Sequence, residues 1–154
     1  TGILPLHFGS LLAGKKPADP WLQTLDQYGT ALGRVFQIQD DIMGSFGLEA
    51  ETGKANTGDL REAKWTILTE LLYPCLTTQE KNQFEQLFTK AKRSQAEIKT
   101  IKQLMIKYDV VKQAQIRAEQ FVTQGILAIS QLGVNKAYET MLQKLLYFML
   151  NRTK

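Results

Sequence analysis

Two adjacent aspartates, Asp40 and Asp41, are the residues most able to do chemistry in this chain. Their segment is otherwise apolar, with Phe36, Ile38 and Ile42 around them. Two carboxylates among apolar side chains are costly unless a cation neutralises them. Mg²⁺ takes oxygen ligands and is often held by one or two carboxylates together with substrate phosphates. The pair therefore predicts part of a magnesium site.

The spacing around the pair leaves two interpretations open. Gln37, Asp40 and Asp41 lie three and four residues apart, so a helix would place them on one face. Gly44 stands where a third carboxylate would join that face, and it supplies none. The pair could equally be a solvated acidic patch on a bundle helix. No Lys or Arg follows either aspartate four residues later, which favours a cation from outside the chain.

The segment that follows has the residues to bind an anion. Lys54 and Lys64 supply positive charge, and the intervening glycines let backbone amides approach a ligand. Asp59, with Glu62 three residues later, predicts the capped start of a helix whose N-terminus would favour phosphate oxygens. As an isolated pattern these residues are common in surface loops. Their place directly behind the acidic pair predicts a magnesium–diphosphate site.

Composition excludes several classes of protein. The chain has 154 residues, of which 44% are hydrophobic, enough for one core, so a disordered chain is not expected. Its single cysteine, Cys75, excludes an internal disulfide framework and agrees with a reducing cytoplasm. We expect that cysteine to be a small buried hydrophobe. No uninterrupted apolar stretch approaches the roughly 20 residues of a membrane span.

A basic run suggests one further class. The formal net charge is only +4, but residues 90–117 contain eight basic and two acidic residues. Such a run could be a nucleic-acid face. It is more typical of the solvent side of amphipathic helices, and aromatic residues are not interleaved in a base-stacking pattern. We therefore expect no nucleic-acid partner, and we expect His7, the only histidine, to be structural.

Hydrophobic residues recur with helical spacing through almost every long segment. Asp19 before Pro20 is typical of an N-cap followed by proline at the first helical position, and it predicts a helix over residues 20–46. The other expected helices cover residues 59–74, 77–88, 98–105, 110–129 and 137–148. No segment alternates polar and apolar residues as a strand would. The prediction is an all-α protein of six or seven helices packed as a bundle.

Taken together, these motifs resemble a known family. Residues 36–47 are similar to the second aspartate-rich motif of the trans-isoprenyl diphosphate synthases, or polyprenyl synthetases. Residues 52–54 and 58–66 resemble the block that follows it, and residues 5–14 and 28–33 match the family upstream. The end of the chain, from Tyr147, is similar to its basic C-terminus. The likeness covers the whole chain but only the C-terminal half of the family's single domain, so residues 1–154 are expected to be that half and to begin inside a functional helix.

The resemblance implies an isoprenoid-synthase helical bundle and a Mg²⁺-dependent prenyltransferase. Such an enzyme condenses an allylic diphosphate with isopentenyl diphosphate to give a longer prenyl diphosphate, in isoprenoid biosynthesis. Independently of the resemblance, we expect a homodimer. The 154 residues alone are expected to be inactive and to associate through exposed apolar faces. The alternatives are a non-catalytic helical subunit that regulates such a synthase, and a basic nucleic-acid-binding module.

The resemblance also assigns roles to single residues. Asp40 would bind the third magnesium on the allylic diphosphate, with Asp41 supporting it directly or through water. Asp59 would support the metal-bound waters. The remaining implied roles are gripping the leaving diphosphate (Lys54, Lys64), facing the reacting carbons (Thr1, Gln37) and closing over the diphosphate (Arg152, Lys154). Gly44 departs from the family's full Asp-Asp-x-x-Asp pattern, which leaves the third acidic ligand unassigned.

Overall fold

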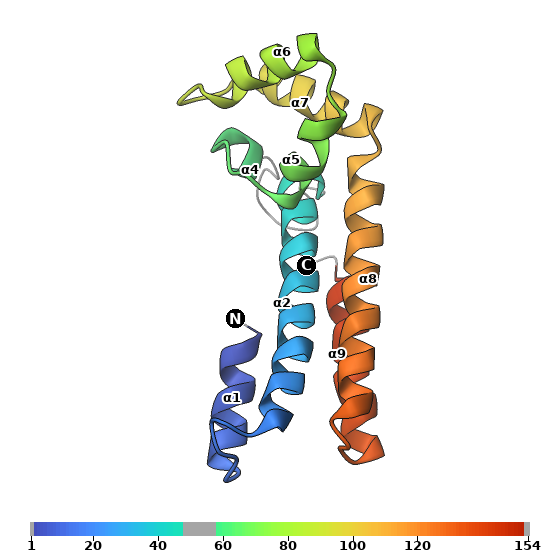
Figure 1. Cartoon of the computed structure of the whole chain (residues 1–154). Coiled ribbons are helices and arrows are strands. Elements are labelled where there is room, and N and C mark those ends of the chain that lie inside the picture. The colour runs from blue at the N-terminus through green and yellow to red at the C-terminus, as the bar shows by residue number, and fades with distance from the viewer. Residues whose placement is uncertain (1, 48–57, 153–154) are drawn as a thin grey trace. The chain divides into compact units, whose positions relative to one another are not determined.

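A computed structural model describes residues 2–47 and 58–152. Every regular element in these residues is a helix, which confirms the predicted all-α class (Figure 1). The described chain forms two compact units, one of residues 2–39 with 117–152 and one of residues 40–116. Two long helices, α2 (Pro20–Phe46) and α8 (Val110–Gln131), each contribute to both units. None of the described helices is both long and apolar enough to cross a membrane.

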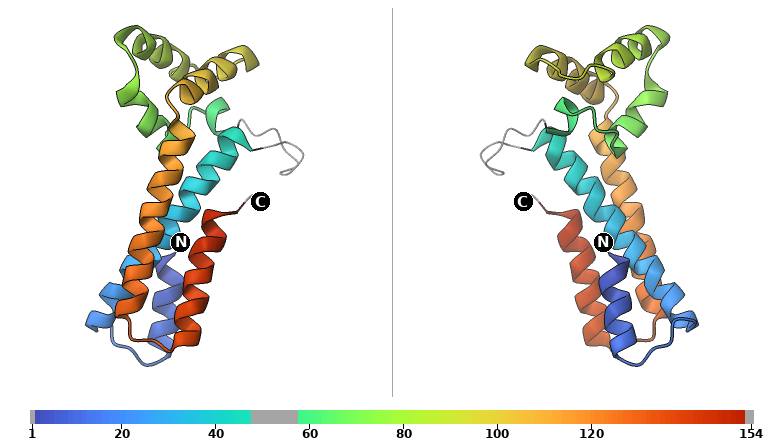
Figure 2. Two further views of the ribbon diagram at one scale, coloured as in Figure 1. Left: turned by 90° about the vertical axis from the view of Figure 1, so that its right-hand side faces the viewer. Right: turned by 90° about the vertical axis from the view of Figure 1, so that its left-hand side faces the viewer.

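The first unit is a small helical bundle. It contains α1 (Ile3–Leu12), the first part of α2, the second part of α8, and α9 (Lys136–Leu150), which run alongside one another (Figure 2). Its core is built from Tyr28, Val35, Ile129 and Leu146, all at most 1% exposed. The Tyr28 hydroxyl donates to the Leu142 carbonyl oxygen at 3.1 Å, and burial raises its pKa to about 12. Core burial and this hydrogen bond attach α2 to α9.

One local prediction for this unit is confirmed. The Trp21 amide donates to Asp19 Oδ1 at 3.0 Å, so Asp19 caps α2 and Pro20 is its first residue, as the sequence predicts. This backbone hydrogen bond lowers the pKa of Asp19. The Nε2 of His7, which we expect to be structural, pairs with Asp26 on α2. Helix α1 was not predictable from the sequence, because its apolar residues lack a clear helical period.

The second unit combines the end of α2 with a series of shorter helices. These are α4 (Gly58–Arg61), α5 (Ile67–Leu72), the 3₁₀ turn η1 (Tyr73–Cys75), α6 (Thr78–Phe88) and α7 (Gln95–Lys107). Capping boxes begin α6 and α7: Thr77 pairs with Glu80, and Ser94 pairs with Glu97. The fully buried side chains of this unit's core include Leu68, Leu72, Phe84, Ile98, Ile101 and Met105.

The single helix predicted over residues 59–74 is wrong. The structure has two short helices there, separated by residues 62–66. Ala63 has a φ of 54°, and the Lys64 amide donates to the Asp59 carbonyl oxygen at 2.9 Å, which closes α4 after one turn. Asp59 consequently lies inside α4 and does not cap it. The predicted helix does begin beside Asp59, at Gly58, but its four residues add little dipole for a phosphate.

The prediction for Cys75 is also wrong. Its thiol is exposed, not buried, and donates to the Leu71 carbonyl oxygen at 3.4 Å. Cys75 is the last residue of the η1 turn, directly after Pro74, and not part of α5.

Candidate functional site

The two aspartates of the acidic pair have opposite environments. Asp40 is exposed near the end of α2, whereas Asp41 is only 3% exposed. Successive helical residues point about 100° apart, so one carboxylate faces solvent while the next faces the second unit's interior. Asp40 is therefore the carboxylate that an external ligand can reach.

Asp41 has a structural role that the sequence did not reveal. Its Oδ2 accepts a hydrogen bond from the Ile67 amide at 3.2 Å, at the first residue of α5. The N-cap residue of that helix, Thr66, makes no side-chain cap hydrogen bond. Asp41 thus accepts a hydrogen bond from an amide of α5 that has no acceptor within α5. The negative charge of Asp41 also suits the N-terminus of α5. One carboxylate oxygen of the predicted metal ligand is engaged in this way.

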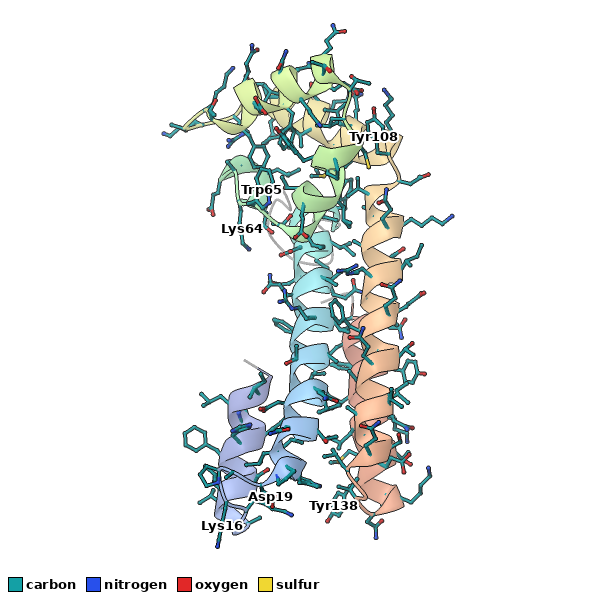
Figure 3. All side chains as sticks on the ribbon, in the orientation of Figure 1. Lys16, Asp19, Lys64, Trp65, Tyr108 and Tyr138 are labelled. Carbon is teal, nitrogen blue, oxygen red and sulfur yellow. The ribbon has the colours of Figure 1, made fainter. Side chains whose placement is uncertain are left out.

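Lys64 and Asp59 lie together in the same unit. The Lys64 Nζ is 3.3 Å from Asp59 Oδ1, and Figure 3 shows Lys64 beside Trp65 on the segment between α4 and α5. Partial burial lowers the pKa of Lys64, but the hydrogen bond and charge of Asp59, with the charges of Asp41 and Asp40, outweigh it and hold the pKa above its usual value. The Lys64 ammonium group is therefore influenced by three carboxylates. The Lys64 side chain is nevertheless 48% exposed.

This donor set fits a hard divalent cation that a ligand helps to hold. Within residues 2–47 and 58–152, no three Asp, Glu, His or Cys side chains gather closely enough to bind a metal ion by themselves. Asp40 and Asp41 offer only oxygen atoms. Mg²⁺ is commonly bound through one or two carboxylates completed by phosphate oxygens and water. The residues present fit such an ion in company with a phosphorylated ligand.

Arg93 is a site-supporting residue that the sequence analysis missed. It was counted in the basic run, but it is 7% exposed, and its guanidinium donates to the Arg61 carbonyl oxygen at 2.9 Å and the Phe88 carbonyl oxygen at 2.5 Å. The guanidinium carbon also lies 5.1 Å from the Phe88 ring centroid. Burial lowers the pKa of Arg93. Because Arg61 ends α4, Arg93 fixes the short helix that carries Asp59. No signal in the sequence separates this arginine from its exposed neighbours.

Much of the remaining basic run is used within the protein. Lys107 pairs with Glu80 at 2.7 Å, which with Tyr108 and Thr77 lowers the pKa of that glutamate to about 2. Lys102 is half-buried, with its Nζ 5.4 Å from the Phe46 ring centroid, and burial lowers its pKa. These two lysines of the basic run are therefore engaged in contacts within the protein.

The remaining predicted site residues divide into two groups. Gln37 is an exposed residue of α2 in the first unit. Arg152 belongs to the same unit, and its guanidinium carbon lies 4.3 Å from the Phe36 ring centroid, while the Gln39 side-chain amide donates to the Leu150 carbonyl oxygen. The end of α9 is thus attached to the part of α2 that directly precedes the acidic pair in the sequence. Three predicted residues, Thr1, Lys54 and Lys154, lie outside the described residues.

A groove in the first unit is a weaker candidate. It is lined by residues of α2 and α8, among them Thr30, Gln124 and Leu127. Its one titratable lining side chain among the described residues, Asp26, is paired with His7. The groove offers no set of groups for acid–base or metal chemistry, so we place the candidate site in the second unit.

The comparison with known families decides the classification. The sequence model of the polyprenyl synthetase family matches residues 1–105, about two thirds of the chain and all of the segment that carries the acidic pair and Lys64. The chain belongs to the polyprenyl synthetase family. The resemblance drawn from residues 36–66 is thereby confirmed.

Curated relatives agree with this membership. The geranylgeranyl diphosphate synthase of Sulfolobus acidocaldarius is 33% identical over 126 residues, which cover 81% of this chain and 37% of the relative. That of Saccharolobus solfataricus is 30% identical over 140 residues, which cover 90% of this chain and 42% of the relative. The chain thus spans less than half the length of the curated polyprenyl synthetases it matches.

Solved structures place the fold in the same family. A geranylgeranyl pyrophosphate synthase from Corynebacterium glutamicum, complexed with isoprenyl diphosphate and magnesium, matches 99% of this chain and 43% of its own, with a TM-score of 0.82 and 26% identity. A polyprenyl synthase from Caulobacter crescentus, complexed with calcium and isoprenyl diphosphate, matches 95% of this chain and 44% of its own, with a TM-score of 0.80 and 23% identity. The second likeness concerns the fold alone. The predicted isoprenoid-synthase bundle is confirmed.

Proposed function

We propose that this chain is the C-terminal half of the catalytic domain of a trans-prenyltransferase. The intact enzyme would condense an allylic diphosphate with isopentenyl diphosphate, releasing diphosphate and a longer prenyl diphosphate. The observation that carries the proposal is an exposed carboxylate, Asp40, in the same unit as the half-exposed Lys64, whose ammonium lies 3.3 Å from Asp59. Such an arrangement can bind a metal-complexed diphosphate through both its cation and its oxygens.

In this proposal Asp40 and Asp41 hold the metal ion. When bound, Mg²⁺ would neutralise charge on the diphosphate as it leaves. Lys64 would donate hydrogen bonds to the departing oxygens, and Asp59 would hold the lysine near α2. The same roles extend by proposal to the other predicted residues, with Lys54 on the diphosphate, Thr1 and Gln37 near the reacting carbons, and Arg152 and Lys154 closing from the C-terminus.

The relatives support the choice of ligand and metal. Two are geranylgeranyl diphosphate synthases, and one solved structure was obtained with isoprenyl diphosphate and magnesium. Another was obtained with calcium, so a divalent cation is the shared feature. We propose magnesium for this chain because oxygen donors from only one or two carboxylates match its usual coordination. The exposed, unpaired Cys75 supports a reducing compartment, and we propose the cytoplasm.

Replacing Lys64 with Met tests the proposed diphosphate site. We expect the affinity for inorganic pyrophosphate in Mg²⁺, measured by titration calorimetry, to fall about tenfold or more, because a charge-assisted contact is lost. The matched control is Lys112→Met, which removes an exposed lysine of α8 in the same unit and should leave the affinity unchanged. Equal affinities for both variants would refute the role of Lys64. Salt-sensitive binding of random DNA that Asp40→Ala does not alter would favour the nucleic-acid module instead.

Exposed apolar side chains support a homodimeric partner. On α1, Leu4, Phe8 and Leu12 are 63%, 59% and 89% exposed, and on α9, Tyr138 and Phe148 are each 62% exposed. Apolar surface of this extent favours association. We therefore predict that the 154-residue chain self-associates, with an average mass in light scattering that rises with protein concentration. A mass that stays at one chain throughout the concentration range would contradict this prediction.

A further inference from the structure

Gly44 is a helical glycine with a side chain packed against the space where its own Cβ would lie. It lies one turn after Asp40 on α2. A Cβ atom added to it would lie 2.5 Å from Asp59 Oδ2 and 3.1 Å from Asp59 Cγ. The first distance is shorter than real Cβ contacts, so an added side chain would require the carboxylate to move. Glycine inside a helix is less favourable than alanine by roughly 0.5–1 kcal/mol. The close approach of Asp59 supplies the physical reason for glycine here.

The carboxylate that fills this space also holds Lys64. Asp59 Oδ1 accepts from the Lys64 Nζ at 3.3 Å, while Oδ2 lies against the Gly44 backbone. The side chain of Asp59 is 18% exposed, so it is well packed for a surface carboxylate. The absence of a side chain at position 44 therefore determines how closely the pair of Asp59 and Lys64 approaches α2.

We propose that Gly44 is a positioning residue, whose missing side chain lets Asp59 dock against α2 and hold Lys64 beside the acidic pair. A carboxylate at position 44, as the family's full Asp-Asp-x-x-Asp pattern has, would compete with Asp59 for the same space. In this chain such a substitution would disrupt the site. The packing claim stands independently, whereas its consequence for ligand binding rests on the proposed diphosphate function.

A double-mutant cycle on thermal unfolding of the 154-residue chain tests the packing claim. Gly9 is the matched control, because it lies inside α1 with no atom within 4 Å of an added Cβ. Gly9→Ala should raise Tm by about 2–4 °C through helix propensity. Gly44→Ala should lower Tm in the natural sequence, and should raise it by a similar amount when Asp59→Ala is also present.

The sign reversal is the decisive feature of the cycle. If Gly44→Ala raises Tm equally in the natural sequence and in the Asp59→Ala variant, the proposal is overturned. If Gly44→Ala prevents folding, recovery of folding by Asp59→Ala supports the proposal, and failure to recover overturns it. Neither readout depends on activity or on a bound metal.

The consequence for the site is tested with inorganic pyrophosphate in Mg²⁺. Gly44→Asp should weaken binding about tenfold or more, because the added side chain displaces Asp59 and Asp59 then no longer holds Lys64 in place. Tighter binding by Gly44→Asp would overturn the positioning role. If the natural chain binds no pyrophosphate, the proposed function fails, and the consequence of Gly44 for ligand binding fails with it. The unfolding cycle still decides whether Gly44 makes room for Asp59.

Discussion

Asp40→Asn is expected to lower prenyl-transfer turnover by about 10²–10³-fold, because a charge that stabilises the departing diphosphate complex is lost. The assay uses a fusion in which this chain replaces the matching residues of the Sulfolobus acidocaldarius synthase, so that a complete domain is present. Turnover is measured as isopentenyl diphosphate incorporated into a longer product. Asp40 is exposed, so its substitution should change Tm little.

The matched control for Asp40 is Glu62→Gln. Glu62 is an exposed acid in the same unit, in the turn after α4, so this variant removes one negative charge near the site without touching the acidic pair. The fusion with Glu62→Gln should retain turnover within about twofold. Turnover of the folded Asp40→Asn fusion that equals this control would remove Asp40 from the metal site.

Arg93→Ala is expected to destabilise the chain by about 2–4 kcal/mol, since a buried guanidinium with two carbonyl acceptors is lost. Lys92→Ala is the control, because Lys92 is the exposed neighbour and its loss should cost little. Arg93→Lys should fall between them, since one ammonium group cannot reproduce the planar arrangement of donors. Urea unfolding measures all three. A midpoint for Arg93→Ala equal to that of Lys92→Ala would show that the guanidinium contacts contribute nothing.

The helices that carry their own start signals were predictable from the sequence. Asp19 before Pro20 fixes the start of α2, and Thr77 three residues before Glu80 fixes the start of α6. Both signals act within a few residues, and hydrophobic spacing then determines the face that is buried. The division between α4 and α5 was not predictable, because it depends on Ala63 adopting a positive φ without glycine.

The candidate site was predictable in its residue types and not in its contacts. The acidic pair and Lys64 stand out in the sequence, since charges beside apolar residues imply a ligand. The separate contacts of the aspartates are not evident from the sequence. Asp41 caps α5 from another helix, and Asp59 fills the space at Gly44. These contacts join segments that lie 15 to 26 residues apart, so only the folded chain determines them.

The measurement that tests the central claim most directly is a calorimetric cycle of Asp40→Asn and Lys64→Met with inorganic pyrophosphate, with and without Mg²⁺. If both side chains act on one metal-bound diphosphate, the natural chain binds more tightly with Mg²⁺ and Asp40→Asn abolishes that difference. The double variant then loses less affinity than the sum of the two single losses. If pyrophosphate affinity is independent of Mg²⁺, and the affinity losses of the two single variants add up in the double variant, then Asp40 and Lys64 do not share a ligand.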